Sequence, residues 1–238
     1  MKILGYCILL YGREYLDVTI QSVLPFCDKI IILYTPHPSQ GYRTDEVCPE
    51  TKEELKAICD KYDKIEWKDT DCWDEGTHTG EIYKYSEGYD VLLRFDADEV
   101  FEPKDLVQAL KTIEETPYEE YGIDGFHHFW KSFNNVITDG FRPVRFIKPA
   151  GEGRTDIKCR IYHFGYAQNI ETIRYKMTVS GHKSEWRTEW WDTYLNWGIS
   201  SRFLHPTSIG VWEKAEPFNR FDLPEILHLH PNFNKLVI

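Results

Sequence analysis

Four consecutive residues, Asp96-Ala97-Asp98-Glu99, follow the mainly apolar, strand-type run Val91–Phe95 and are the most informative in the sequence. Such a run predicts a buried strand, which delivers the next residues to the carboxyl edge of a sheet. In an extended backbone, Asp96 and Asp98 share one side and small Ala97 faces away. Two neighbouring carboxylates repel each other unless a hard cation such as Mg²⁺ or Mn²⁺ lies between them. The spacing therefore predicts a cation site for a diphosphate. The alternatives are a solvated acidic turn or a helix cap.

The first hundred residues alternate strand and helix patterns, which would place these acids in a layered fold. Apolar strands separated by helices are typical of βαβ units, so we expect an α/β fold with a mostly parallel, Rossmann-like sheet flanked by helices. No GxGxxG follows the first strand, and a dinucleotide-binding domain is not expected. Strands are predicted over residues 2–11, 29–35, 64–68 and 90–95, helices over 14–24, 50–62 and 80–88, and a loop over 37–49.

The remainder of the chain is rich in aromatic residues. A helix over 104–115 precedes strand-like segments at 125–130, 141–147 and 160–166 and a candidate helix over 170–177. His128 and Trp130 would share one strand face, either as an acceptor platform or as ordinary aromatic core. The tryptophans of 186–197 are expected to serve packing. No Gly/Ser linker separates the halves, so we expect one domain over 1–238, with a nucleotide-type half (1–103) and an aromatic half (104–238).

Composition excludes several classes of function. The net charge of −11, with Lys and Arg scattered, argues against a protein held to DNA or to an anionic bilayer by its overall field. The longest apolar run, Ile3–Tyr11, is shorter than the roughly 20 residues of a spanning helix, and no cleavage site follows it. The six cysteines lack CxxC spacing. We therefore expect reduced thiols, no membrane span and a cytoplasmic location.

Three stretches resemble the family-2-type glycosyltransferases of the GT-A fold. Residues 13–32 are similar to that family's opening helix and second strand, residues 90–99 to its metal-binding strand, and residues 142–147 to the strand entering its acceptor region. The resemblance spans residues 1–150. It implies a metal-dependent, inverting enzyme that moves a sugar from a nucleotide-diphosphate donor, most readily a UDP-sugar, to a hydroxyl acceptor.

The resemblance also assigns residues to the donor. Asp96 and Asp98 would be the D-x-D carboxylates that hold Mn²⁺ or Mg²⁺, with Asp98 the more direct ligand. Tyr11, Arg13 and Glu14, in the loop after the first strand, would border the nucleoside.

One position departs from the family pattern. An Asp usually ends the second strand and holds the base or ribose, whereas Tyr34-Thr35-Pro36 stands there. Asp69 and Asp71, after the third strand, are candidates to supply that carboxylate, or they belong to a polar loop.

A downstream histidine often completes the metal shell in GT-A enzymes, and His163, between apolar neighbours, suits that role. The alternative is a hydrogen-bonded core histidine. His182, His228 and His230 are weaker candidates.

An inverting transfer also needs a general base near the acceptor hydroxyl. Asp156 is preferred, and Glu152 and Asp139 are alternatives. Arg142 and Arg145 would meet phosphates or form surface salt bridges.

Two other functions remain open. A sugar nucleotidyltransferase normally carries a Gly-rich basic loop after the first strand, and Tyr11-Gly12-Arg13 is a poor version of one. A non-catalytic carbohydrate-binding protein would use the aromatic half alone. For a transferase, the acceptor would be a carbohydrate or another hydroxyl-bearing molecule; a modified base in nucleic acid is a further class, disfavoured by the net charge.

Overall fold

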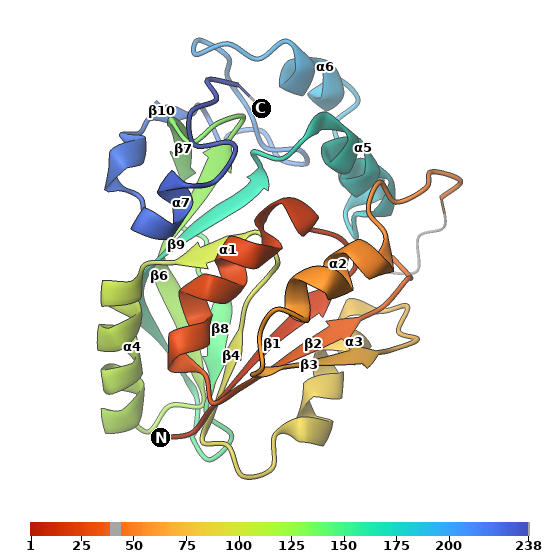
Figure 1. Ribbon diagram of the computed structural model, residues 1–238. Coiled ribbons are helices and arrows are strands. Elements are labelled where there is room, and N and C mark those ends of the chain that lie inside the picture. The colour runs from red at the N-terminus through yellow and green to blue at the C-terminus, as the bar shows by residue number, and fades with distance from the viewer. Residues whose placement is uncertain (39–43, 238) are drawn as a thin grey trace.

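The computed structural model describes residues 1–38 and 44–237; residues 39–43 of the predicted loop lie outside the described residues. Four parallel strands form the first part of the sheet, in the order β3-β2-β1-β4 (Figure 1). This arrangement confirms the α/β fold with a parallel core. The strands are β1 (Ile3–Leu9), β2 (Lys29–Tyr34), β3 (Ile65–Asp69) and β4 (Val91–Arg94).

Both faces of β1, β2 and β4 are buried, which explains their nearly continuous apolar sequences, whereas the edge strand β3 is only half-buried. Along β1, Cys7 and Leu9 belong to one core cluster, to which three helices contribute, and Leu4 and Tyr6 belong to the cluster that includes Ile82. The helices that contribute to the first cluster are α1 (Arg13–Val23), α2 (Lys52–Cys59) and α4 (Pro103–Glu115). A short 3-10 helix, η1 (Leu24–Phe26), directly follows α1. Ile82 lies in the 3-10 helix η3 (Glu81–Tyr85), which follows α3 (Glu75–Gly80) where a single helix over 80–88 was expected.

Side-chain caps fix where several helices begin. Thr51 and Glu54 form a capping box at the start of α2, and Asp74 accepts the backbone N–H of Thr77 at the start of α3. Asn169 caps α5 (Ile170–Val179) by accepting the backbone N–H of Thr172. These bonds satisfy N–H groups that the helices themselves leave unpaired.

Antiparallel strands extend the sheet beyond β4, in the order β8-β6-β7-β10. The longest strand, β9, pairs in parallel with β6 and antiparallel with β5. The parallel arrangement thus belongs to the first half, and the second half is mixed. The strands are β5 (Glu99–Phe101), β6 (Glu120–Trp130), β7 (Asn135–Thr138), β8 (Val144–Ile147), β9 (Arg154–Tyr166) and β10 (Glu216–Pro217).

The tryptophan-rich segment packs over the far end of β6 and β9 (Figure 1). Trp130, Trp190 and Trp212 are almost completely buried in one cluster with Tyr166. His128 is also buried, so His128 and Trp130 form core rather than an exposed platform. The remaining helices are α5, η4 (Lys183–Glu185), α6 (Trp190–Leu195), η5 (Arg220–Asp222) and α7 (Glu225–His228).

All six cysteines are free thiols. Within the described ranges, no helix combines the length and apolar character needed to cross a membrane.

Candidate active site

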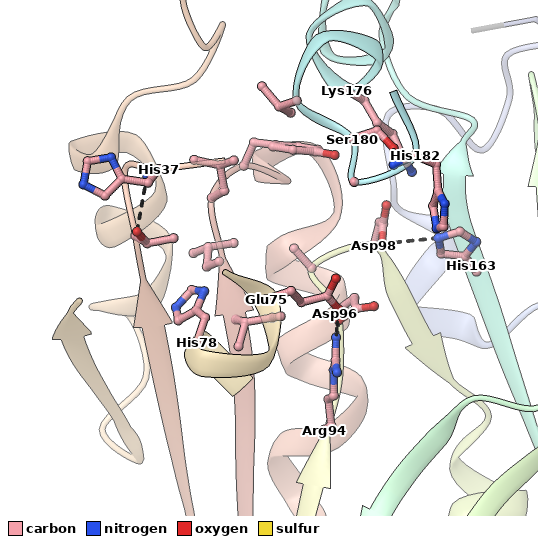
Figure 2. A pocket seen from close by; sticks show the side chains of 18 of the residues that line it. His37, Glu75, His78, Arg94, Asp96, Asp98, His163, Lys176, Ser180 and His182 are labelled. Atoms are coloured by element: carbon pink, nitrogen blue, oxygen red, sulfur yellow. Dashed lines mark hydrogen bonds and ion pairs between the residues drawn. The ribbon is translucent and has the colours of Figure 1, made fainter. Parts of the chain in front are cut away.

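A cavity of about 460 Å³ opens at the carboxyl ends of the parallel strands (Figure 2). Ligands of open α/β sheets bind at this edge, because the loops after the strands converge there. The cavity also takes residues from α3, β9, α5 and the segment after α5. Its polar and charged lining residues are Tyr11, Thr35, His37, Glu75, His78, Arg94, Asp96, Asp98, His163, Lys176, Ser180, His182 and Glu185.

The two predicted acids both line the cavity, but they do not share one side of an extended strand. The backbone turns after β4, and the N–H of Glu99 donates to the carbonyl of Asp96 at 3.1 Å. This turn leads into β5, and it directs the side chains of Asp96 and Asp98 away from each other, as Figure 2 shows. The expectation of an extended Asp96-Ala97-Asp98 segment is therefore wrong.

Asp96 is held by two arginines. Its Oδ2 lies 3.0 Å from Arg145 Nη2, and its Oδ1 lies 3.6 Å from Arg94 Nε. Burial works to raise the pKa of Asp96, but the charges of Arg145 and Arg94 outweigh burial and leave this pKa below its ordinary value. The arginines themselves bind Glu99 and Glu75, at 2.7 Å from Arg145 Nε and 3.0 Å from Arg94 Nη2. The positive charges of Arg145 and Arg94 thus partly offset the repulsion between Asp96 and Asp98. Of its two predicted roles, phosphate binding and salt-bridge formation, Arg145 has the second in this structure.

Asp98 has different surroundings. Its Oδ2 accepts a hydrogen bond of 2.7 Å from Nε2 of the fully buried Gln168. Its Oδ1 faces His163 Nε2 at 3.7 Å. Burial, opposed by the charge of Lys176, raises the pKa of Asp98 above its ordinary value. Gln168 therefore orients this carboxylate and leaves one oxygen directed at the imidazole.

His163 comes from the carboxyl end of β9, as the position of its predicted strand suggested. Its Nδ1 lies 3.0 Å from Nδ1 of His128 on the neighbouring β6. Burial lowers the pKa of His163 well below its ordinary value, so this imidazole is neutral near pH 7. A Cβ atom on Gly165 would overlap His163 Nε2, so the glycine keeps the space beside that nitrogen open.

Lys176 and Glu185 also line the cavity and could not be identified from the sequence, whereas His182 was a weaker candidate for the metal shell. Lys176 Nζ donates to the carbonyl of Gly165 at 3.1 Å, and in the described part of the chain no carboxylate lies within ion-pair distance of it. His182 Nδ1 lies 3.2 Å from Glu185 Oε2. Figure 2 shows Lys176 and His182 on the side of the cavity formed by α5 and the following segment. The local sequence around these residues indicates only that a helix ends near Ser180-Gly181, and it does not indicate a binding site.

The loop after β1 contributes only one of its three predicted residues. Tyr11 lines the cavity and packs edge-on against Tyr175, with ring centroids 5.7 Å apart. Arg13 instead forms an ion pair with Glu54. Glu14 accepts the backbone N–H of Asn169 at 2.8 Å and joins α1 to the start of α5.

The carboxylates after β3 also lie outside the cavity lining. Asp69 binds Lys52 Nζ at 2.7 Å. Asp71 is exposed, and its Oδ1 lies 2.5 Å from Nε2 of the cavity residue His37. His37 in turn stacks on Trp73, with centroids 3.7 Å apart. Asp71 therefore reaches the rim only through His37.

The structure does not bring the preferred base candidates to the cavity. Asp156 lies seven residues before His163 on the same strand, about 23 Å away at 3.3 Å per residue. It faces Arg142 at 3.4 Å, so Arg142 belongs to a surface salt bridge. Glu152 precedes β9 at the same distant end.

Of the three weaker histidine candidates for the metal shell, two form hydrogen bonds with backbone carbonyls away from the cavity. His228 and His230 bond backbone carbonyls of Leu223 and Glu14 at 3.0 and 2.8 Å. Neither lines the cavity, whereas His182 does.

The residues at the cavity fit a divalent cation in part. Two ligands of one octahedral ion, each about 2.1 Å from it, are about 3.0 Å apart when adjacent and about 4.2 Å apart when opposite. Asp98 Oδ1 and His163 Nε2 are 3.7 Å apart, so both can contact one ion, but they would have to shift to take adjacent octahedral positions. Among residues 1–38 and 44–237, no group of three His, Cys, Asp or Glu side chains is arranged to hold a metal ion. A cation here would therefore need phosphate oxygens or water as additional ligands, which Mg²⁺ ordinarily retains.

No protein-family model matches this sequence, and no curated protein sequence matches it. Similar solved structures include 4-diphosphocytidyl-2C-methyl-D-erythritol synthase from Anaerococcus prevotii, with 11% identity, TM-score 0.43, and coverage of 77% of this chain and 96% of that one. Glucosyl-3-phosphoglycerate synthase from Mycobacterium tuberculosis, solved with Mn²⁺, UDP and phosphoglyceric acid, has 10% identity, TM-score 0.37, and coverage of 52% and 43%. TarS of S. aureus has 14% identity, TM-score 0.40, and coverage of 62% and 28%.

These matches span less than half the length of the synthase from M. tuberculosis and of TarS. At these identities and TM-scores the likenesses carry no conclusion about this chain. The strand order itself, with four parallel strands in the order β3-β2-β1-β4 and an antiparallel continuation through β8 and β6, is that of a Rossmann-like α/β sheet with an antiparallel extension.

Proposed function

We propose that this protein is a metal-dependent glycosyltransferase that moves a sugar from a nucleotide-diphosphate donor to a hydroxyl acceptor. The observation that carries the proposal is the pair Asp98 Oδ1 and His163 Nε2. These atoms face each other across 3.7 Å in a cavity at the carboxyl edge of the parallel strands. When both groups are unprotonated at these atoms, neither has a proton to donate to the other, so a cation between them would satisfy both.

Asp98 and His163 would hold Mn²⁺ or Mg²⁺, with Asp96 nearby as a weaker contributor because two arginines already bind it. When bound, such an ion neutralises the charge of a departing nucleoside diphosphate. Lys176 would bind the diphosphate directly, since its ammonium group lines the cavity without a carboxylate partner in the described part of the chain. Tyr11, from the loop after β1, would border the nucleoside.

The His182–Glu185 pair would supply the general base. His182 Nδ1 lies 3.2 Å from Glu185 Oε2. With its proton on Nδ1, donated to Glu185, the imidazole would have Nε2 free to take the proton of an acceptor hydroxyl. Both residues line the cavity, whereas Asp156 and Glu152 lie at the far end of β9. The hydroxyl oxygen would attack the anomeric carbon as the bond to the diphosphate oxygen breaks, and His182 would retain the proton.

Donor hydrolysis provides a test that needs no knowledge of the acceptor. The protein is incubated with a panel of nucleotide sugars and Mn²⁺, and release of nucleoside diphosphate is measured with and without excess chelator. We expect metal-dependent release from at least one donor, with a UDP-sugar the first to test. Release of pyrophosphate from a nucleoside triphosphate and a sugar phosphate would indicate a nucleotidyltransferase instead. Sugar binding without nucleotide or metal, and without turnover, would indicate a carbohydrate-binding protein.

A further inference from the structure

The N-terminus of α1 is capped by a side chain from a distant part of the sequence. Oε2 of Glu50 accepts the backbone N–H of Gly12 at 2.6 Å and that of Arg13 at 2.8 Å. The N–H groups at the start of a helix have no partner within the helix, and here one carboxylate oxygen takes two of them. Glu50 is only 5% exposed, so water does not compete freely for these contacts. The start of α1 is therefore an anion site that the protein's own carboxylate fills.

This place in the fold is one where α/β proteins commonly hold a phosphate. A helix that follows a parallel strand begins at the carboxyl edge of the sheet, and its N–H groups and its dipole attract anions. Here α1 follows β1 in that way, and Tyr11, the residue before Gly12, lines the cavity. A Cβ atom on Gly12 would overlap Cβ of Ala97, which also lines the cavity. A nucleotide in the cavity would thus lie close to the start of α1, where Glu50 is already bound.

The other contacts around this helix start leave no place for a phosphate. Oε1 of Glu50 lies 3.3 Å from Oγ1 of the fully buried Thr172 in α5, so the carboxylate joins α1 to α5. Arg13, the basic residue of the loop after β1, forms its ion pair with Glu54 on α2. The loop therefore offers an incoming phosphate neither the N–H groups of Gly12 and Arg13 nor an unpaired side-chain cation.

The contact between Glu50 and α5 also concerns the cation on the other side of the cavity. Thr172 and Lys176 are four residues apart on α5 and therefore share one face of that helix. Lys176 lines the cavity, and its ammonium group donates to the carbonyl of Gly165. Glu50 thus fills the anion site at α1 and, through Thr172, holds the helix that offers a positive charge elsewhere in the cavity.

We propose that Glu50 is a specificity-determining residue that excludes phosphate groups from the N-terminus of α1. Its carboxylate occupies the N–H groups of Gly12 and Arg13 and would repel a phosphate placed beside them. The phosphates of a bound nucleotide are thereby confined to the side of the cavity formed by Lys176. Because the loop after β1 cannot cradle a triphosphate, the substrates are narrowed to nucleoside-diphosphate donors. This consequence rests on the proposed function, whereas the exclusion of phosphate is a property of the protein alone.

Titration of the ¹⁵N-labelled native protein with inorganic phosphate tests the exclusion directly. The readout is the pair of backbone amide NMR signals from Gly12 and Arg13. We expect neither signal to move, because Glu50 already accepts both N–H groups. A saturable shift of both signals would overturn the proposal without the need for any variant.

Glu50→Ala tests the cause. Loss of the carboxylate frees both N–H groups, so the folded variant should bind phosphate at Gly12 and Arg13 at least about tenfold more tightly than the native protein. Glu50→Gln keeps an oxygen acceptor in the same place and should stay close to the native protein. The matched control is Glu53→Ala, which removes an exposed carboxylate three residues further along the chain; its titration should also be unchanged. Folded Glu50→Ala without phosphate binding at these amides, or an equal gain in Glu50→Gln or Glu53→Ala, would contradict the proposal.

Calorimetry with UDP and UTP in the presence of Mg²⁺ tests the consequence for substrates. The affinity for UTP relative to UDP should rise in Glu50→Ala and stay as in the native protein in Glu53→Ala. An unchanged ratio in folded Glu50→Ala would contradict the narrowing to diphosphate donors. If the phosphate titrations are as expected and no nucleotide sugar is cleaved under any condition, the proposed function fails while the exclusion of phosphate by Glu50 stands.

Discussion

The two halves of the molecule each supply one side of the candidate cation site, and they position it by different means. Asp98 lies four residues beyond the end of the buried parallel strand β4, so local chain geometry brings it to the carboxyl edge of the sheet. His163 reaches the same cavity only because β9 pairs with β6, and its ring is oriented by His128 across that pairing. The position of Asp98, from the parallel half, is therefore determined mainly by local sequence, whereas the position of His163, from the mixed half, depends on long-range packing.

Asp98→Asn should produce the largest effect, because it removes the charged partner that the parallel half contributes. The loss of a cation's charge stabilisation is worth several kcal/mol, or on the order of 10³-fold in turnover. Donor hydrolysis and Mn²⁺ calorimetry measure this change. Thermal stability should not fall in the metal-free protein, since the variant removes a buried carboxylate whose pKa is already raised. Near-native turnover would exclude Asp98 as a ligand.

His182→Gln tests the contribution of the mixed half to proton transfer. A positioned base contributes about 10²- to 10⁴-fold, so transfer to an acceptor should fall by roughly 10²-fold or more while Mn²⁺ affinity stays within about twofold. Steady-state rates with an identified donor and acceptor provide the measurement. Equal losses of transfer and of Mn²⁺ binding would show that His182 acts on the cation instead of the hydroxyl.

Asp96→Asn separates the two acids of the parallel half. Asp96 is about one third exposed and pairs with Arg145 and Arg94, so its removal should lower the free energy of unfolding by about 2 kcal/mol after allowance for solvent screening. Urea denaturation measures the loss, and Mn²⁺ affinity should fall much less than in Asp98→Asn. A variant as stable as the native protein, with cation binding abolished, would reverse the roles assigned here.

The pH dependence of cation binding provides a smaller effect. The pKa of Asp98 is raised, so as pH falls this carboxylate takes up a proton before an ordinary aspartate does, whereas the lowered pKa of His163 keeps the imidazole neutral into more acidic conditions. The proton competes with the cation for Asp98. Mn²⁺ affinity should therefore be greatest on the alkaline side and decline by up to about tenfold per unit below the pKa of Asp98. Calorimetry across a pH series measures it; affinity that does not change on acidification would contradict a carboxylate ligand with a raised pKa.

The comparison of the halves also explains what the sequence could predict. The parallel strands and their helices, and the location of Asp96 and Asp98, follow from short-range apolar patterns. The turn at Asp96 could not be predicted in the same way, because it brings the side chain to Arg145, which is 49 residues away along the chain. The sequence does not reveal the contact between Asp96 and Arg145, so it predicts that the strand simply continues in an extended conformation through Asp98.

In the second half, the sequence suggested His163 only through a family resemblance, and its preferred base, Asp156, does not lie at the cavity. Asp156 was attractive as a carboxylate between the acceptor strand and His163, but the long β9 separates it from the cavity. The contact of His128 Nε2 with Asp139 Oδ1, which lie 3.7 Å apart, depends on the register of β6 against both β7 and β9. Lys176 and His182 depend on how α5 lies over the sheet. Periodicity does not encode any of these relations.

One measurement tests the central claim most directly: anomalous diffraction at the manganese edge from crystals of the protein soaked with Mn²⁺ and UDP. We expect a single strong peak about 2.1 to 2.3 Å from both Asp98 Oδ1 and His163 Nε2, with diphosphate oxygens completing the shell. A peak bound to other side chains, or crystals with ordered UDP and no manganese between these two atoms, would contradict the account.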